Sequence, residues 1–219
     1  MSITKKKLSL ISILLFLIPF ITIIICLENH SNFKNDDVFP FFDGKVSISL
    51  VGRQFYNVFL FKLSFSVYGL LSIIFYFFLS NRLSKLKIKN RISIIGIVLN
   101  IFLFIYLILL GDKSFDLSSS IRRIAIISYI VILFIIHIKT FLYLKILLSR
   151  KKGIFLSLCK NICLFFLIIM FLFVIVGSPW VNPLIDYPYN LKNVIEWNFF
   201  LFSILFYLPL SNLLFNLKK

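Results

Sequence analysis

Long apolar runs restrict the fold of this chain more than any other feature. An α-helix needs about 20 apolar residues to cross about 30 Å of hydrocarbon, and the sequence contains six runs of roughly that length. They cover residues 8–27, 58–79, 92–110, 124–147, 154–176 and 194–215. Little of the 219-residue chain is left for a separate soluble domain. We therefore predict an all-α, polytopic membrane protein in which residues 1–219 form a single transmembrane domain, a bundle of six helices.

Composition argues against the other fold classes. Of all residues, 60% are hydrophobic and 15% are charged, which is too little polar surface to cover a soluble globule. A transmembrane β-barrel needs short alternating segments separated by turns, whereas the apolar runs here are long and continuous. The first run follows three lysines, as a signal peptide would, but no small-residue cleavage site comes after it. We expect it to be a retained helix.

The distribution of charge predicts the orientation. With six helices and a cytoplasmic N-terminus, the basic segments at 5–7, 82–91, 150–152 and 218–219 fall on the cytoplasmic side, and the eight acidic residues fall on the other. Lysine and arginine in short loops set topology, so we predict that both termini lie inside. The net charge of +16 then reflects topology and contact with anionic lipids. We expect no nucleic-acid partner.

The longest outer loop, residues 28–57, is predicted to form a structured cap. Its sequence contains a turn signal at Asp43-Gly44, followed at residues 45–51 by the alternating pattern KVSISLV, which is typical of an extended segment. The third outer loop carries three prolines and the aromatic residues Trp180, Tyr187 and Tyr189. Aromatic side chains of this kind favour the headgroup layer.

Few polar residues lie inside the predicted helices. Asn100 is expected to hydrogen-bond across the bundle, and His137 has no carboxylate on the inner half of any helix with which to share a proton. Cys159 and Cys163 lie one turn apart, but no histidine or further cysteine completes a ligand set. We expect no metal and no cofactor.

A carboxylate at the start of the last apolar run defines the candidate site. Glu196, followed directly by Trp197, is placed near the outer interface, level with several arginines. Two readings stay open. The carboxylate either forms an ion pair that fixes the third outer loop, or it binds a lipid headgroup or takes part in catalysis. No residue is assigned a catalytic role, and the question of enzymatic activity is left open. The candidate site residues are Glu196, Trp197, Asp186, Arg53, Asp43, Arg122 and Arg123.

Three segments resemble the Frag1/DRAM/Sfk1 family of eukaryotic membrane proteins. They are FPFFDGKVSIS in the first outer loop, VGRQFYNVFLF before the second helix and VIEWNFFLF at the start of the sixth. The family typically has a proline-containing motif in the first outer loop and an acid-aromatic pair at the sixth helix. Members often carry a histidine before the fourth helix, where this chain has Ser119, Ser120 or Ile121. A shared catalytic histidine is therefore not expected.

The resemblance implies a role in handling or organising membrane lipids. It implies a location in the Golgi, the endoplasmic reticulum or another endomembrane, with the plasma membrane as the alternative. Within the family, such roles include remodelling of the lipid of glycosylphosphatidylinositol (GPI) anchors and roles in autophagy and lysosomes. The expected partners are membrane lipids, and other membrane proteins are left open as partners.

The alternative function is that of a membrane subunit of a small transporter or permease. Transporters usually contain discontinuous helices and charges near the membrane midplane. Here Pro19 and Pro209 lie within predicted spans, but the midplane carries no charge. This pattern favours lipid handling.

The topology predicts which residues share a side of the membrane. Asp36, Asp112 and Asp186 are expected on one side, and Lys87 and Lys151 on the other, because only this threading puts the basic loops inside. Single-cysteine labelling in intact and permeabilised vesicles, in a background without the three native cysteines, measures this. Labelling of residue 87 from the same side as residue 36 would contradict the six-helix arrangement.

Overall fold

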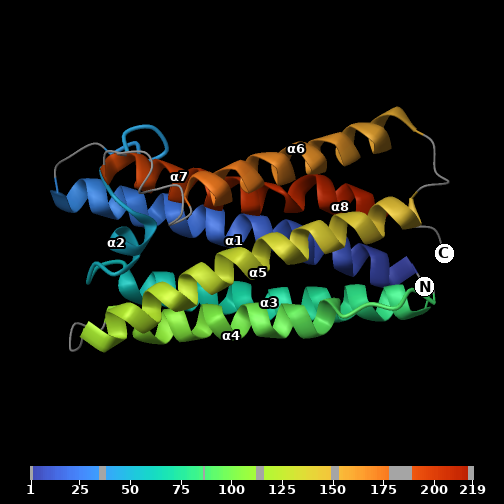
Figure 1. Ribbon diagram of the computed structural model, residues 1–219, viewed down its shortest axis with the longest axis horizontal. Helices are drawn as coiled ribbons and strands as arrows, with labels where there is room; N and C mark the ends of the chain where they lie inside the picture. The colour runs from blue at the N-terminus through green and yellow to red at the C-terminus, as the bar shows by residue number, and fades with distance from the viewer. Residues whose placement is uncertain are drawn as a thin grey trace.

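The computed structural model is a bundle of long helices lying side by side (Figure 1). It describes residues 2–34, 38–85, 87–111, 116–148, 153–177 and 189–216. The helices are α1 (Ser2–Lys34), α2 (Ile48–Gly52), α3 (Val58–Lys85), α4 (Ile92–Leu109), α5 (Asp116–Leu147), α6 (Ile154–Val176), α7 (Tyr189–Leu205) and α8 (Tyr207–Phe215). Six spans are long and apolar enough to cross a membrane, the sixth being α7 together with α8. The predicted fold class is confirmed.

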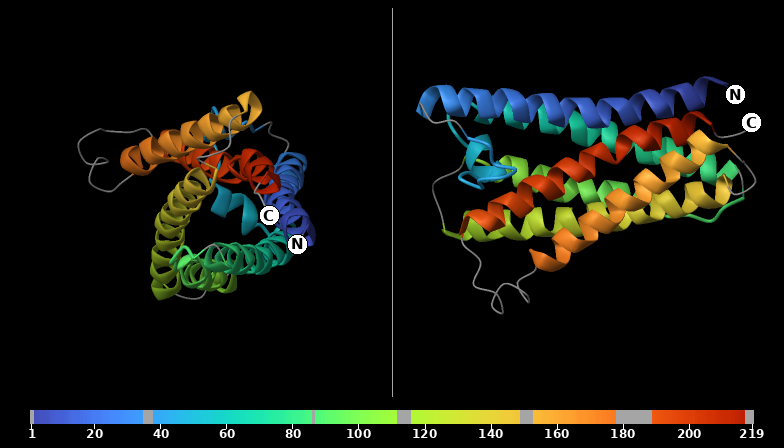
Figure 2. Two further views of the ribbon diagram at one scale, coloured as in Figure 1. Left: turned by 90° about the vertical axis from the view of Figure 1, so that its right-hand side faces the viewer. Right: turned by 90° about the horizontal axis from the view of Figure 1, so that it is seen from above.

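The helices are arranged as a ring when seen along the bundle (Figure 2). Around the ring, α5 packs on α4, α4 on α3, α3 on α1 and α1 on α8, while α6 packs on both α7 and α8 and closes the ring against α5. Close packing of α5 on α7 is absent within the described residues. The start of α1 and the end of α8 lie at the same end of the bundle (Figure 1), as an even number of spans requires. Their cytoplasmic location stays a prediction.

Several helices are longer than the sequence predicted: α3 continues to Lys85 rather than ending at residue 79, and α7 begins at Tyr189 rather than at residue 194. Helix α1 continues to Lys34 rather than ending at residue 27, and α5 begins at Asp116 rather than at residue 124. Apolar length reports only the part of a helix that contacts hydrocarbon, while backbone hydrogen bonding can continue into the interface. The polar extensions therefore leave no signal in an apolar run.

The last span was predicted as one helix over 194–215, but it is broken at Phe206 between α7 and α8. Pro209 explains the break, because it has no N–H to offer the carbonyl of Leu205 and its ring crowds that carbonyl. A proline alone does not decide the outcome, since Pro19 lies inside the continuous helix α1.

Side chains from neighbouring helices contact backbone carbonyl oxygens near the break. Ser12 Oγ of α1 donates a hydrogen bond to the backbone carbonyl oxygen of Tyr207 at 2.9 Å. The ring of His137 on α5 lies between two carbonyls, with Nδ1 2.7 Å from the Leu133 oxygen and Nε2 3.2 Å from the Ser203 oxygen. These contacts link the region of the break to α1 and α5.

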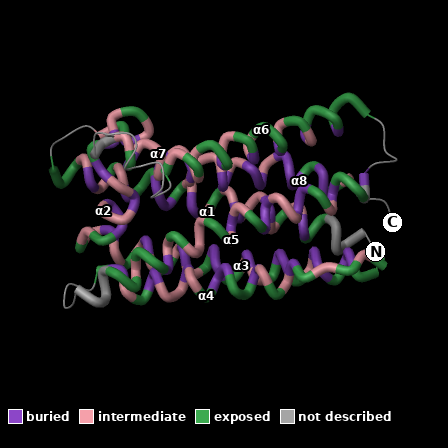
Figure 3. The backbone as a smooth tube through the Cα atoms, in the orientation of Figure 1, coloured by how far each residue is buried: buried purple, intermediate pink, exposed green. Residues whose placement is uncertain are grey.

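Buried and exposed residues alternate along the spanning helices (Figure 3). Exposed apolar side chains occur on every spanning helix, which is expected of a surface in contact with lipid. Buried Asn100 donates to Ser72 Oγ at 3.2 Å and to the Gly96 oxygen at 2.7 Å. The predicted hydrogen bond across the bundle is therefore confirmed, and it joins α4 to α3.

Gly96 lets α3 and α4 approach closely. A Cβ added there would lie 2.8 Å from Tyr76 Cβ, so we expect Gly96→Ala to cost about 1–3 kcal/mol through overpacking. Gly153→Ala is the matched control, because its nearest neighbour would be Leu156 Cβ at 3.9 Å. Thermal unfolding in detergent measures both variants. Equal melting temperatures for the two would contradict the predicted close packing at Gly96.

Candidate functional site

Residues 38–57, which we call the cap, connect α1 to α3 at the end of the bundle opposite the start of α1 (Figure 1). We call this end the cap end. The cap begins with a turn that Asp43 organises, since its carboxylate accepts hydrogen bonds from the backbone N–H groups of Phe39 and Lys45, both at 2.9 Å. Gly44 has a φ of 59°, a left-handed conformation that favours glycine. The predicted turn at Asp43-Gly44 is confirmed.

The second part of the cap is the short helix α2, not the extended segment predicted over 45–51. Ser47 is its N-cap, and Ser47 Oγ accepts a hydrogen bond from the Leu50 N–H at 3.1 Å. Alternating apolar residues favour a strand only where a partner strand can pair with it. The described part of the chain holds no strand, so a helical turn satisfies this backbone instead.

Side chains from the first half of α7 hold the cap in place. Three of them donate hydrogen bonds to cap carbonyl oxygens, which otherwise would lack a partner in a region with little water. The bonds run from Asn193 Nδ2 to Gly44 (2.7 Å), from Trp197 Nε1 to Val46 (2.7 Å) and from Asn198 Nδ2 to Phe41 (3.0 Å). Trp197 is completely buried. The acid-aromatic pair singled out in the sequence thus lies against the cap.

The Glu196 carboxylate binds the cap from the same helix. It accepts hydrogen bonds from the backbone N–H groups of Ile48 and Ser49. These N–H groups belong to the first turn of α2 and have no acceptor within that helix, and a helix N-terminus favours a negative charge. Backbone amides therefore take the place of the predicted arginine partner. Among the residues that the structure describes, none forms an ion pair with Glu196.

The remaining candidate residues fall into two groups. Glu196, Arg53 and Arg122 all lie within electrostatic range of the Tyr106 hydroxyl. Arg122 Nη1 also lies 3.5 Å from the Leu109 oxygen. Arg123 is exposed on α5, and Asp186 lies outside the described residues. Asp43 acts within the cap turn rather than beside Glu196.

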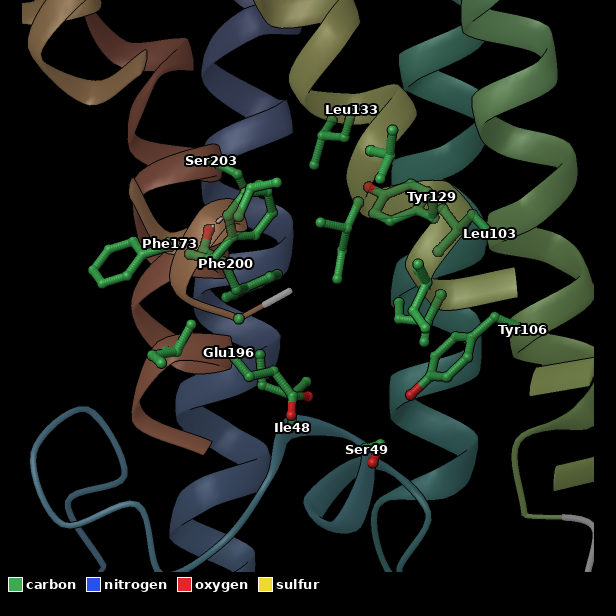
Figure 4. Close-up of a pocket in the computed structure, with 18 of the residues that line it drawn as sticks. Ile48, Ser49, Leu103, Tyr106, Tyr129, Leu133, Phe173, Glu196, Phe200 and Ser203 are labelled. Atoms are coloured by element: carbon green, nitrogen blue, oxygen red, sulfur yellow. Dashed lines mark hydrogen bonds between the residues drawn. The ribbon is translucent and has the colours of Figure 1, made fainter. Parts of the chain in front are cut away.

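A cavity of about 450 Å³ lies inside the ring next to Glu196 (Figure 4). Its volume is within the range of about 300–1,000 Å³ that ligand pockets usually have. Helices α3 to α7 form its walls, and α2 contributes Ile48 and Ser49 at the cap end. The lining is mostly apolar and includes Phe65, Leu103, Ile130, Leu133, Phe173 and Phe200.

Polar groups are concentrated at the cap end of this cavity. Glu196, Ser49 and Lys192 line it there, and Tyr106 lies on the opposite wall with its hydroxyl directed towards the cap end (Figure 4). The Tyr106 hydroxyl has no hydrogen-bond partner within the described ranges, whereas Tyr129, deeper in the cavity, donates to Tyr68 at 3.4 Å. The cavity therefore combines a long apolar part with one polar end.

The cavity extends to the side of the bundle. Ile127 and Val131 of α5 line the cavity, yet they are 54% and 42% exposed on the outer surface of the bundle. Helices α5 and α7 pack only loosely on one another among the described residues, with His137 Nε2 3.2 Å from the Ser203 oxygen. At the cap end, Trp197 and Val51 are buried, whereas Lys192, which also lines the cavity, is exposed. A ligand can reach the cavity from the side of the bundle that faces hydrocarbon.

Several residues of the site were missed by sequence reasoning. Tyr106 was read only as part of an apolar run, and a tyrosine near the end of a span is the one signal that could have marked it. Asn193 and Asn198 flank Glu196 in the stretch NVIEWN. This cluster of polar side chains at the start of a span could have indicated that α7 binds another segment.

No protein-family model, no curated protein and no solved structure matches this chain. These comparisons do not bear on the resemblance to the Frag1/DRAM/Sfk1 family, which stays a prediction. The function has to be argued from the site itself.

Glu196→Gln is expected to destabilise the protein. The amide oxygen can accept a hydrogen bond from one of the two cap N–H groups, but the NH2 group of the amide then faces the other N–H. A buried donor is left without an acceptor, at a cost of about 1–3 kcal/mol. Lys192→Gln, an exposed neighbour on α7, is the control and should keep the parent melting temperature in detergent. Combining Glu196→Gln with Arg122→Gln should give additive effects. A strongly non-additive effect of the two substitutions would indicate an ion pair between Glu196 and Arg122 and would contradict the capping role.

Proposed function

We propose that this protein binds a membrane lipid in the cavity, as part of handling or organising membrane lipids. The observation that carries the proposal is the sideways opening of an apolar cavity at Ile127 and Val131. An acyl chain can pass from the bilayer into such an opening without crossing water. The polar groups at the cap end would then meet the headgroup near the interface, where headgroups lie.

The alternative function, a membrane subunit of a small transporter, has one observation in its favour. The break between α7 and α8 resembles the discontinuous helices whose free backbone groups bind substrates and ions in transporters. Here the carbonyls of Ser203 and Tyr207 already have contacts with His137 and Ser12. These two carbonyls are therefore less available to a substrate, and the apolar cavity that extends to Ile127 and Val131 makes lipid binding the better supported function.

The finer assignments rest on the family resemblance alone. A location in the Golgi, the endoplasmic reticulum or another endomembrane, a part in GPI-anchor lipid remodelling, and a role in autophagy or lysosomes remain proposals of that kind. The cavity supports lipid binding in any of these membranes. It assigns no catalytic role to a residue.

Photo-crosslinking tests the proposal. Purified protein in nanodiscs is exposed to a phospholipid with a diazirine in its acyl chain, and the labelled peptides are mapped by mass spectrometry. Crosslinks are expected at cavity residues such as Ile130 and Phe200, in addition to crosslinks on the outer surface. Ile130→Trp fills the cavity and should lower the cavity crosslinks several-fold.

The matched control is Ile94→Trp, because Ile94 is 61% exposed on the outside of α4. This variant should leave the cavity crosslinks unchanged. Crosslinks confined to outward-facing residues, or cavity crosslinks that persist in Ile130→Trp, would contradict lipid binding in the cavity.

A further inference from the structure

The polar end of the cavity, rather than its apolar wall, has to select the ligand. A lipid tail gains little by leaving the bilayer for an apolar cavity, because hydrocarbon and apolar side chains offer it similar surroundings. Lipids that share the same tails differ only in their headgroups. Selection between them therefore depends on the groups around Glu196.

Glu196 has acceptor capacity left over after it binds the cap. An ionised carboxylate has about four lone-pair sites, and the backbone N–H groups of Ile48 and Ser49 use two of the available directions. The side chain also lines the cavity, so its remaining acceptor capacity is available to a ligand. A negative charge with free acceptor sites in an apolar surrounding favours a ligand that is both cationic and a hydrogen-bond donor.

Tyr106 provides a second oxygen for the same ligand. Its side chain is buried, 5% exposed, but its hydroxyl has no partner in the part of the chain that is described and faces the cap end (Figure 4). Glu196 on α7 and Tyr106 on α4 lie on opposite walls of the cavity. A group bound between them would be held from both sides.

We propose that the cap end of the cavity binds a primary ammonium headgroup, with Glu196 and Tyr106 as its acceptors. A primary ammonium has three N–H donors, enough for the carboxylate and the phenol oxygen together. A quaternary ammonium such as choline carries the same charge but has no N–H group, so it cannot make these bonds. This inference rests on the proposed lipid-binding function and adds the class of headgroup.

The surrounding charges fit the rest of such a headgroup. In phosphatidylethanolamine the ammonium is linked to a phosphate, and Arg53 and Arg122 lie within electrostatic range of Tyr106. Lys192 lines the cavity and is exposed. Glu196 and Lys192 in the lining, with two arginines within electrostatic range of Tyr106, match a zwitterion better than a headgroup that carries phosphate alone.

A pair of crosslinking lipids tests the inference. Phosphatidylethanolamine and phosphatidylcholine with the same diazirine-bearing tail are compared in nanodiscs, and crosslinks to Ile130 and Phe200 are counted. We expect several-fold more cavity crosslinks from phosphatidylethanolamine. Tyr106→Phe and Glu196→Gln should each reduce that preference several-fold. Asn198→Ala is the control matched for stability, because it removes one cap hydrogen bond without touching the cavity, and it should keep the preference.

The outcomes separate this inference from the proposed function. Equal cavity crosslinking by the two lipids would overturn the ammonium site and leave lipid binding in place. Absence of cavity crosslinks from both lipids would overturn the proposed function. If soluble O-phosphoethanolamine at the concentration of the lipid abolished the cavity crosslinks, the natural ligand of the ammonium site would be a water-soluble amine rather than a lipid. If Asn198→Ala also lost the preference for phosphatidylethanolamine, Glu196 would act only by holding the cap, and the ammonium site would be contradicted.

Discussion

The hydrogen bonds between the Glu196 carboxylate and the backbone of α2 are the interaction on which the rest of the site depends. They join α7, a spanning helix, to the cap between α1 and α3. Without them the first turn of α2 would present free N–H groups in a region with little water. Asn193, Trp197 and Asn198 add bonds to cap carbonyls, so donors and acceptors of the cap are both satisfied from one helix. This holds the cap over one end of the cavity, and the lining also reaches the side of the bundle at Ile127 and Val131.

Satisfaction of polar groups also explains why the deeper part of the cavity is a poor site for a charged ligand. Tyr129 donates to Tyr68 within the lining of the cavity, and behind the lining Tyr76 and Tyr207 share a hydrogen bond of 3.0 Å. His137 lies against two carbonyls beside the break in the last span. These groups have one another as partners, and a ligand would have to displace them. Among the described residues that line the cavity, Glu196 and Tyr106 at the cap end keep free hydrogen-bonding capacity, so the chemistry of the cavity is concentrated there.

The sequence predicts some of these features well, for physical reasons that differ from one element to the next. The six spans follow from the thickness of hydrocarbon, and the turn at Asp43-Gly44 follows from turn chemistry. The helix break was harder to predict, because Pro19 and Pro209 both lie within spans and only the second interrupts its helix. For residues 45–51, an alternating pattern favours a strand, but the decision between strand and helix depends on a partner strand that the pattern cannot reveal. Glu196 was placed correctly at the start of the last span, whereas its partners were not, since backbone amides have no signature in the sequence.

The cavity itself leaves no pattern in the sequence, because it lies where α5 and α7 pack only loosely on one another. Ile127 and Val131 would look the same on a face that packs on α7 as on a face that touches lipid. What the sequence does mark is the one place where a charge is kept at the border of the apolar region, and that residue has two tasks that do not compete. The amides of α2 and a ligand ammonium approach different lone pairs of one carboxylate, so a headgroup can bind without opening the cap. The same acid that holds the cap over one end of the cavity can therefore also select what enters from the bilayer.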